Sequence, residues 1–215
     1  MNRKLINIVT AASRIPNLNR LGESIRIAKK KSKLQALWFV VVDGLRAPMD
    51  MHQLKPLQAS LEKPLIVVCH KDPESVAGGG QKNRALQIIQ DGFICFLDDD
   101  NLMHPDYLIG METAIKKNPS KWTFICGQRR LDSIKNLPSG PGCIRQNNID
   151  TAQFLVHKSR VGNIRWEKVR HNDFCFINAV LRSHPGEFFF IPDFLCYYNY
   201  LNHPEKEWLK AEEKI

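Results

Sequence analysis

The chain has 215 residues, and 31 lysines and arginines against 22 aspartates and glutamates give it a formal net charge of +9. This length predicts one domain, and 43% hydrophobic with 25% charged residues is typical of a globular protein, which excludes a disordered chain. The apolar runs stop far short of the roughly 20 residues that cross a bilayer, and the first one is too short for a signal peptide, so we expect a cytosolic protein.

The six cysteines lack the spacing of a zinc site, and most lie in apolar runs. This pattern predicts free thiols that pack as small hydrophobic residues in a reducing compartment. The excess of basic residues leaves three anionic partners open: nucleic acid, an anionic membrane face or a phosphorylated substrate.

The first part of the chain alternates short apolar strands with helical patterns, which predicts βαβ units and a mainly parallel sheet. We expect strands at 5–10, 37–42, 65–69 and 93–97. Their uniform hydrophobicity is typical of strands that are buried on both faces. A helix near Pro16 carries an apolar stripe of Leu18, Leu21, Ile25 and Ala28, and a second helix opens at Gly78–Gly80 and runs to about Gln90.

The second part of the chain is less regular. A helix follows Pro105, a strand is expected at 123–127, and residues 128–150 have turn formers and charges without periodicity. A loop of that length is usually a functional flap or a disordered insertion. Beyond it we expect a strand at 151–156, a helix at 172–183, strands at 188–191 and 196–201, and a charged helical tail from Glu205.

Polar segments follow each of the first four predicted strands, at the strand ends where open α/β sheets bind ligands. They are TAASR, Asp43-Gly44, the Gly78–Gly80 loop and LDDDN. The strongest signal is LDDDN, because its three adjacent aspartates at the end of a buried strand repel one another unless a cation holds them. Oxygen ligands suit Mg²⁺ or Mn²⁺. A turn or helix cap is the competing interpretation, and it explains one aspartate more readily than three.

Three further residues can be interpreted either as functional residues or as ordinary structural or surface residues. Lys82 lies in the first turn of a helix, where a cation is disfavoured, and so indicates an anionic partner such as a nucleotide. Asp173, at the amino end of an apolar helix, is either a helix cap or a general base. His203 by itself reads more readily as a surface residue than as a metal ligand.

Taken in order, the segments resemble the inverting, family 2-like glycosyltransferases of the GT-A fold, which use nucleotide-sugar donors. They are IVTAASR, VVVDG, QKNRAL, LDDDN, HNDFCF and LCYYNYLNHPE. The stretch GGGQKNRALQIIQDGFICFLDDDN is also similar to β-1,3-glucuronyltransferases. The match covers about 5–203, and it implies an α/β, Rossmann-like nucleotide-diphospho-sugar transferase fold with a mainly parallel central sheet flanked by helices.

The resemblance also implies a division of the chain and a role for each matching residue. Residues 1–204 would form the transferase domain, with a nucleotide-binding half at 1–101, an acceptor-binding half at 102–204 and the tail at 205–215 beyond it. The donor nucleotide would be bound by Thr10, Ala12, Asp43, Lys82, Asn83, Asp98 and Asp99. Mn²⁺ or Mg²⁺ would be held by Asp100, Asp98 and His203. Asp173 would be the catalytic base, although Asn172 stands where the family more often has Glu.

The implied function is metal-dependent transfer of a sugar, with inversion, from a nucleotide-diphosphate donor such as a UDP-sugar to a hydroxyl of a glycan or lipid-linked acceptor, as in polysaccharide biosynthesis. The basic surface then suits the diphosphate and an anionic acceptor at a membrane face. A nucleotidyltransferase is the nearest alternative, but TAASRIPNL lacks the glycines of the loop expected there. A nucleic-acid-binding protein is disfavoured because the cations are not interleaved with aromatic residues. A catalytically dead transferase fold kept for binding is the last alternative.

Overall fold

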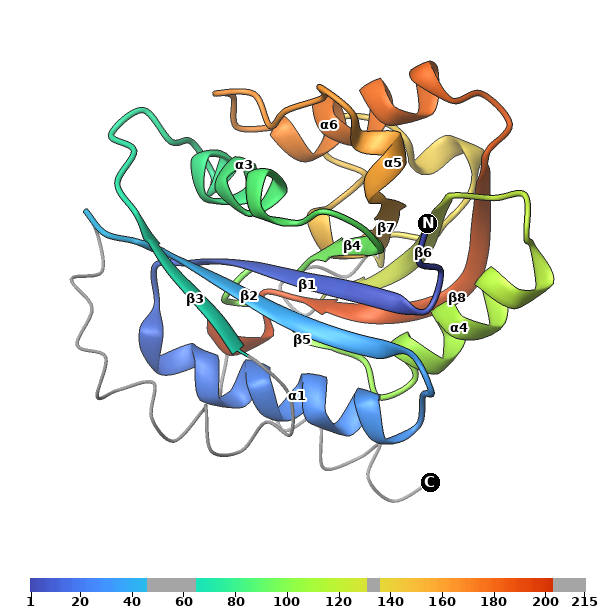
Figure 1. Ribbon diagram of the computed structural model, residues 1–215, viewed down its shortest axis with the longest axis horizontal. Helices are drawn as coiled ribbons and strands as arrows, with labels where there is room; N and C mark the ends of the chain where they lie inside the picture. Colours follow the sequence, from blue (N-terminus) through green and yellow to red (C-terminus); the bar gives the residue numbers. More distant parts are fainter. Residues whose placement is uncertain (46–64, 131–135, 203–215) are drawn as a thin grey trace.

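The computed structural model describes residues 1–45, 65–130 and 136–202, which form one α/β unit around a single sheet (Figure 1). The eight strands of the sheet are ordered β3-β2-β1-β4-β7-β6-β8-β5. They are β1 (Leu5–Ala12), β2 (Gln35–Asp43), β3 (Leu65–His70), β4 (Phe93–Phe96), β5 (Leu102–Met103), β6 (Thr123–Arg130), β7 (Phe154–His157) and β8 (Phe188–Tyr198). All four strands predicted in the first part of the chain are confirmed.

The first four strands form the parallel part of the sheet. β1 lies between β2 and β4, and β3 pairs with the far side of β2, all in parallel. The chain therefore builds outward from β1 in one direction and then returns to its other side with β4. Such a reversal of strand order opens a crevice at the carboxyl ends of the two central strands, and here those strands are β1 and β4.

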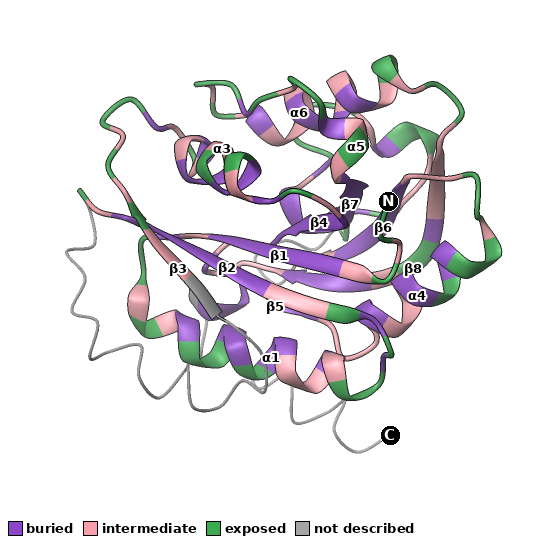
Figure 2. Cartoon of the chain, in the orientation of Figure 1, coloured by how far each residue is buried: buried purple, intermediate pink, exposed green. Residues whose placement is uncertain are grey.

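Helices cover both faces of the sheet, as predicted. α1 (Leu18–Lys30) and α4 (Tyr107–Lys117) pack on one face, whereas α3 (Gly79–Ile88), α5 (Lys158–Val161) and α6 (Asn172–Ser183) lie on the other (Figure 1). Alternate residues of β1 enter two separate cores, with Ile8 facing the predicted stripe of α1 and Val9 facing α3 and α6. The strands between these layers are buried along much of their length (Figure 2), which accounts for their uniform hydrophobicity.

One buried carboxylate belongs to the helical layer of α1 and α4. Glu112 of α4 is 4% exposed and accepts hydrogen bonds from the Ser32 hydroxyl at 2.7 Å, the Lys33 backbone N–H at 2.9 Å and the Lys116 ammonium at 2.6 Å. These donors lower the pKa of Glu112 to about 2, the bond from Lys116 having the largest effect. Glu112 thus fastens the end of α1 to α4.

The second part of the chain departs from the prediction at two strands. The strand expected at 151–156 begins only at Phe154, because Thr151–Gln153 forms a 3₁₀ turn capped by Asp150. The two strands expected at 188–191 and 196–201 are one strand, β8, and a 3₁₀ turn at Tyr200–Asn202 follows it. The register of β8 against β6 shifts between Phe190 and Phe194, so the chain bulges past Pro192 without ending the strand.

The loop expected at 128–150 is shorter than predicted and partly folded against the sheet. Its first residues belong to β6, and Leu137 bridges back to Gln128. Cys143 and Ile149 are buried, so the described part of this segment, 136–150, packs against the core through these side chains.

All six cysteines are free. Of those in apolar runs, Cys95, Cys126 and Cys196 are buried as predicted, and Cys143, in a Gly/Pro stretch, is buried as well. Cys69 is exposed, contrary to the prediction, because it lies on β3 at the edge of the sheet. Within the ranges that the structure describes, none of the helices has the length and hydrophobicity needed to cross a membrane. His203 and the tail at 205–215 lie outside the described residues.

Candidate active site

A cavity of about 230 Å³ lies at the carboxyl ends of β1, β2 and β4, where the strand order opens the crevice. All four polar segments singled out in the sequence contribute to its wall. The lining residues are Ala11, Ala12, Ser13, Arg14, Asp43, Ala77, Gly78, Gln81, Asp98 and Asp100. Gly78 has a φ of +72°, and a Cβ at this position would lie 2.7 Å from the Cβ of Ala11. Glycine therefore allows α3 to begin directly against the end of β1.

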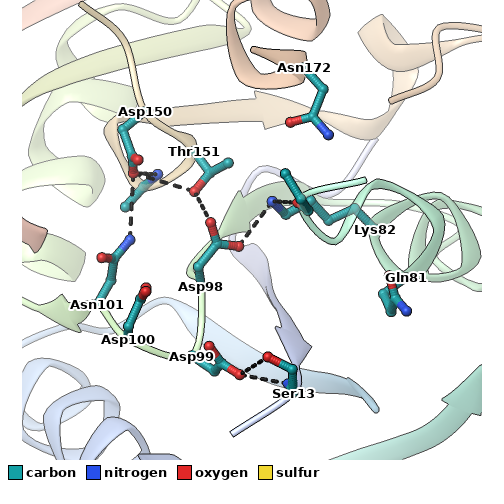
Figure 3. Close-up of polar contacts among 12 residues, drawn as sticks. Ser13, Gln81, Lys82, Asp98, Asp99, Asp100, Asn101, Asp150, Thr151 and Asn172 are labelled. Atoms are coloured by element: carbon teal, nitrogen blue, oxygen red, sulfur yellow. Dashed lines mark hydrogen bonds and ion pairs between the residues drawn. The ribbon is translucent and has the colours of Figure 1, made fainter. Parts of the chain in front are cut away.

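The three adjacent aspartates take different directions at the end of β4. Asp98 and Asp100 point toward Thr151 and Asp150, whereas Asp99 points toward Ser13 (Figure 3). The middle residue is 1% exposed and accepts hydrogen bonds from the backbone N–H groups of Ser13 at 2.6 Å and Arg14 at 2.7 Å. The Arg14 guanidinium adds bonds of 2.8 and 2.5 Å. Asp99 therefore ties the end of β1 to the end of β4.

Asp98 connects the two sides of the crevice. One carboxylate oxygen forms an ion pair with the Lys82 ammonium at 2.9 Å, and the other accepts from the Thr151 hydroxyl at 3.0 Å (Figure 3). Lys82 is 1% exposed, donates to the carbonyl of Ala77 at 3.2 Å and lies 4.7 Å from the ring centre of Trp166. The anionic partner that the sequence predicts for Lys82 is thus, in this structure, the carboxylate of Asp98.

Asp100 has a raised pKa. Burial and then the nearby charge of Asp98 together raise it to about 6, against the opposing effect of Arg14. The Arg14 guanidinium donates to Asp100 at 2.8 Å. A carboxylate that is this difficult to ionise gains when a cation enters the cavity beside it.

Asp150 lies close to the aspartates of the cavity, and the sequence analysis did not single it out. Its Oδ1 accepts from the Gln128 amide at 2.9 Å and from the backbone N–H of Ala152 at 3.2 Å. Burial, followed by the charges of Asp98 and Asp173, raises the pKa of Asp150 to about 6. The sequence DTAQ contains the signature of a capping box, which places Asp150 at the start of a turn. It contains no signal for the distant Asp98.

Asp173 lies in the first turn of α6, one residue inside the helix, because the N-cap position is occupied by His171. Its Oδ1 accepts from the backbone N–H of Phe174 at 2.7 Å. Burial raises the pKa of Asp173, with a further contribution from the charge of Asp98, while the Phe174 bond and Lys82 oppose it. A raised pKa brings a carboxylate nearer to the proton affinity that suits a general base.

Several predicted residues bond to the protein itself. Thr10 is fully buried and accepts from the indole N–H of Trp38 at 2.9 Å. The Asn83 side chain donates to the Trp166 carbonyl at 3.0 Å and accepts from the Trp166 N–H at 2.9 Å. Asn172, 2% exposed, donates to the carbonyl of Val76 at 3.0 Å and so joins α6 to the loop before α3.

The donor set at this edge of the sheet fits a hard cation. Across 1–45, 65–130 and 136–202, no three His, Cys, Asp or Glu side chains form a group that would hold a metal ion. Asp98 and Asp100 nevertheless direct carboxylate oxygens into one cavity. Mg²⁺ commonly binds through one or two carboxylates and completes its shell with water and substrate phosphates. The residues present therefore suit an ion that arrives with a phosphorylated ligand.

The chain has the GT-A fold, as predicted from the sequence. The strand order, the two helix layers and the position of the crevice are those of that fold. No family model and no curated protein sequence matches the chain, whereas solved glycosyltransferase structures do. S. aureus TarS in complex with UDP-GlcNAc is similar to it at a TM-score of 0.68 and 13% identity, over 90% of this chain and 58% of that one. The mannosyltransferase PcManGT from Pyrobaculum calidifontis, in complex with GDP-Man and Mn²⁺, has a TM-score of 0.66 at 13% identity, over 98% and 60%. The chain thus spans less than two thirds of the length of these structures.

Proposed function

We propose that the protein is a metal-dependent inverting glycosyltransferase that moves a sugar from a nucleotide-diphosphate donor, a UDP-sugar, to a hydroxyl of a glycan or lipid-linked acceptor. The observation that carries this proposal is that Asp98 and Asp100 line one cavity at the reversal of strand order, with Asp173 near enough to Asp98 for that charge to raise its pKa. Structures of the same fold that bind UDP-GlcNAc and GDP-Man support it.

The donor nucleotide would occupy the cavity beside β1 and β2. Of the residues that the sequence assigns to it, Ala12, Asp43 and Asp98 line the cavity. Thr10, Asn83 and Asp99 bond to protein groups, and we assign them the task of holding the cavity wall in place. Residues 1–101 would thus bind the nucleotide, and the acceptor would approach from 102–204.

Asp98 and Asp100 would hold Mg²⁺ or Mn²⁺, with His203, outside the described residues, as a third ligand. When bound, the ion supplies positive charge that stabilises the departing diphosphate. Arg14 and Lys82 are the cations of the protein at the same edge, and each is already paired with an aspartate. A net basic protein also suits a diphosphate donor and an acceptor at an anionic membrane face.

Asp173 would act as the catalytic base. The acceptor hydroxyl attacks the anomeric carbon from the side opposite the leaving diphosphate, and Asp173 accepts the hydroxyl proton as the new glycosidic bond forms. One positioned carboxylate is enough for this single displacement, which inverts the configuration at the anomeric carbon. The raised pKa of Asp173 supports this role.

Calorimetry with UDP, in Mn²⁺ and in a metal chelator, tests the proposal. We expect UDP binding that depends on Mn²⁺ and is lost in Asp100→Asn, while Asp106→Asn, at an exposed aspartate paired with Lys31, binds as the wild type does. A panel of nucleotide sugars would then show donor hydrolysis. Absence of UDP binding with Mn²⁺ present would overturn the proposal. Salt-sensitive oligonucleotide binding in its place would favour a nucleic-acid-binding protein.

A further inference from the structure

The cavity contains one buried hydrogen-bond donor that the protein does not use. Gln81, in the first turn of α3, is 1% exposed and lines the cavity together with Asp43 and Gly78. Its Nε2 has no hydrogen-bond partner among the described residues. A buried amide N–H that lacks an acceptor is unfavourable, and native structures rarely keep one without a reason.

The neighbouring serine fixes which end of the Gln81 amide is unused. The Ser75 hydroxyl accepts from the backbone N–H of Gly80 at 3.0 Å and donates to the Oε1 of Gln81 at 2.7 Å. If the amide were turned around, the hydroxyl proton of Ser75, a buried residue, would lose this acceptor. The two N–H donors of Nε2 are therefore the end of the side chain that is left for another molecule.

The cations near Gln81 are already paired. Lys82, the next residue along α3, pairs with Asp98 (Figure 3). The Arg14 guanidinium pairs with Asp99 and Asp100. The sequence assigns Lys82 to the nucleoside, but the structure directs it to Asp98. Gln81 lines the same cavity and has a neutral donor that no described residue accepts from.

A donor amide and an acceptor carboxylate in one cavity match only some nucleobases. The carboxylate of Asp43 lines the same cavity, where its Oδ1 accepts the backbone N–H of Leu45 at 3.0 Å. Uracil presents carbonyl oxygens on either side of a ring N–H, which complements an amide donor and a carboxylate acceptor. Cytosine presents an amino donor beside an unprotonated ring nitrogen, which is the opposite pattern.

We propose that Gln81 selects the nucleobase of the donor by donating from Nε2 to a carbonyl oxygen of uracil. This inference rests on the proposed function, since it concerns the donor of that reaction. It assigns base selection to Gln81 and leaves Lys82 to hold Asp98. Cytidine nucleotides are rejected because their amino group would meet the amide donor.

Gln81→Glu tests this assignment at a single atom, since it replaces Nε2 by oxygen and keeps an acceptor for Ser75. With Mn²⁺ present, we expect the wild type to bind UDP at least about tenfold more tightly than CDP. In Gln81→Glu we expect UDP affinity to fall by about tenfold or more and the preference over CDP to be lost. Gln87→Glu is the matched control, because it changes the same side chain at an exposed position of the same helix.

The outcomes separate this inference from the proposed function. If the wild type binds UDP with Mn²⁺ but Gln81→Glu keeps the preference over CDP, Gln81 does not select the base and the proposed function stands. Equal wild-type affinities for UDP and CDP overturn the inference without any variant, so a Gln81→Glu protein that fails to fold leaves it testable. If neither nucleotide binds, the proposed function fails and the inference fails with it.

Discussion

Glu112 and Asp150 are carboxylates in two regions of the same molecule, and their environments shift the pKa in opposite directions. Donors from Lys116, Ser32 and Lys33 surround Glu112 and lower its pKa to about 2. Asp150 has neutral donors and negatively charged neighbours, and its pKa rises to about 6. In the helical layer, the negative charge of Glu112 is balanced by donors of the protein. At the strand ends, the negative charges of Asp150 and its neighbours repel one another. The excess negative charge makes the crevice electrostatically favourable for a cation or a proton.

The same contrast exists within the three consecutive aspartates. Asp99 is satisfied by Arg14 and Ser13, so its charge serves the fold. Asp100, its neighbour, has a raised pKa and lines the cavity. Two adjacent aspartates thus have different environments, because the tertiary structure brings more donors to Asp99 than to Asp100.

The largest effect is expected from Asp173→Asn. Removing the base should lower the turnover number about 10²–10⁴-fold, because the acceptor hydroxyl loses its proton acceptor in the transition state. Binding of UDP with Mn²⁺ should stay within about twofold of the wild type, since the donor occupies the cavity beside β1 and β2. Steady-state kinetics and calorimetry on the same preparation measure both. Unchanged turnover would show that Asp173 is not the base.

Glu112→Gln should lower the stability of the fold more than substitution of an exposed carboxylate does. Losing the charge among its donors should lower the free energy of unfolding by about 2 kcal/mol at pH 7. The pKa of Glu112 is depressed from 4.5 to about 2 in the folded state. Its contribution is therefore present above about pH 4.5 and declines as the pH falls toward about 2. Urea unfolding over this range measures the difference.

The control for Glu112→Gln is Glu23→Gln, on the exposed surface of α1, where Glu23 pairs with Arg26. An exposed pair of this kind contributes about 0.5 kcal/mol or less. Equal losses in the two variants would contradict the structural role given to Glu112.

Asp150→Asn should have a smaller effect of the opposite sign. Its pKa is raised from 3.8 to about 6 in the folded state, so the charged form is disfavoured there. The stability associated with this group is fully present below about pH 3.8 and is lost as the pH rises through about 6. Asparagine also serves as an N-cap and removes the repulsion, so the variant should be about 1–2 kcal/mol more stable at pH 7.5.

At pH 4 the stability of Asp150→Asn and of the wild type should converge, because Asp150 is protonated there in the folded protein. Urea unfolding at the two pH values, with metal removed, measures this. A variant that is less stable than the wild type at pH 7.5 would show that hydrogen bonds to the carboxylate outweigh its repulsion by Asp98 and Asp173.

The first part of the fold could be predicted because its information is local. The uniform hydrophobicity of the first four strands indicates burial on both faces. One buried face of a helix is indicated by the spacing of Leu18, Leu21, Ile25 and Ala28. The helix at Asn172–Ser183 was likewise predicted with its observed bounds. Segments with a cleanly periodic or uniform pattern carry their own structural signal.

Prediction failed where pairing with a distant strand decides the structure. Pro192 and Asp193 look like a break between two strands, but pairing with β6 carries one strand past them through a bulge. Residues 136–150 show no periodicity, because they are held by separate contacts such as the Gln128–Leu137 bridge rather than by a repeating pattern. These elements depend on partners that no local window of sequence contains.

The sequence by itself determined that apolar strands end in polar segments, and that parallel strands bring such ends together. That was enough to place Ala12, Asp43, Asp98 and Asp100 around one crevice. Only the tertiary structure decided that Lys82 pairs with Asp98, that Asp150 approaches the same carboxylate, and that Gln81 keeps an unused donor. The physical reason is that the local pattern of apolar residues determines which residues of a strand or helix are buried and where the strand ends. The pairing of each buried polar group depends on side chains that only packing brings near.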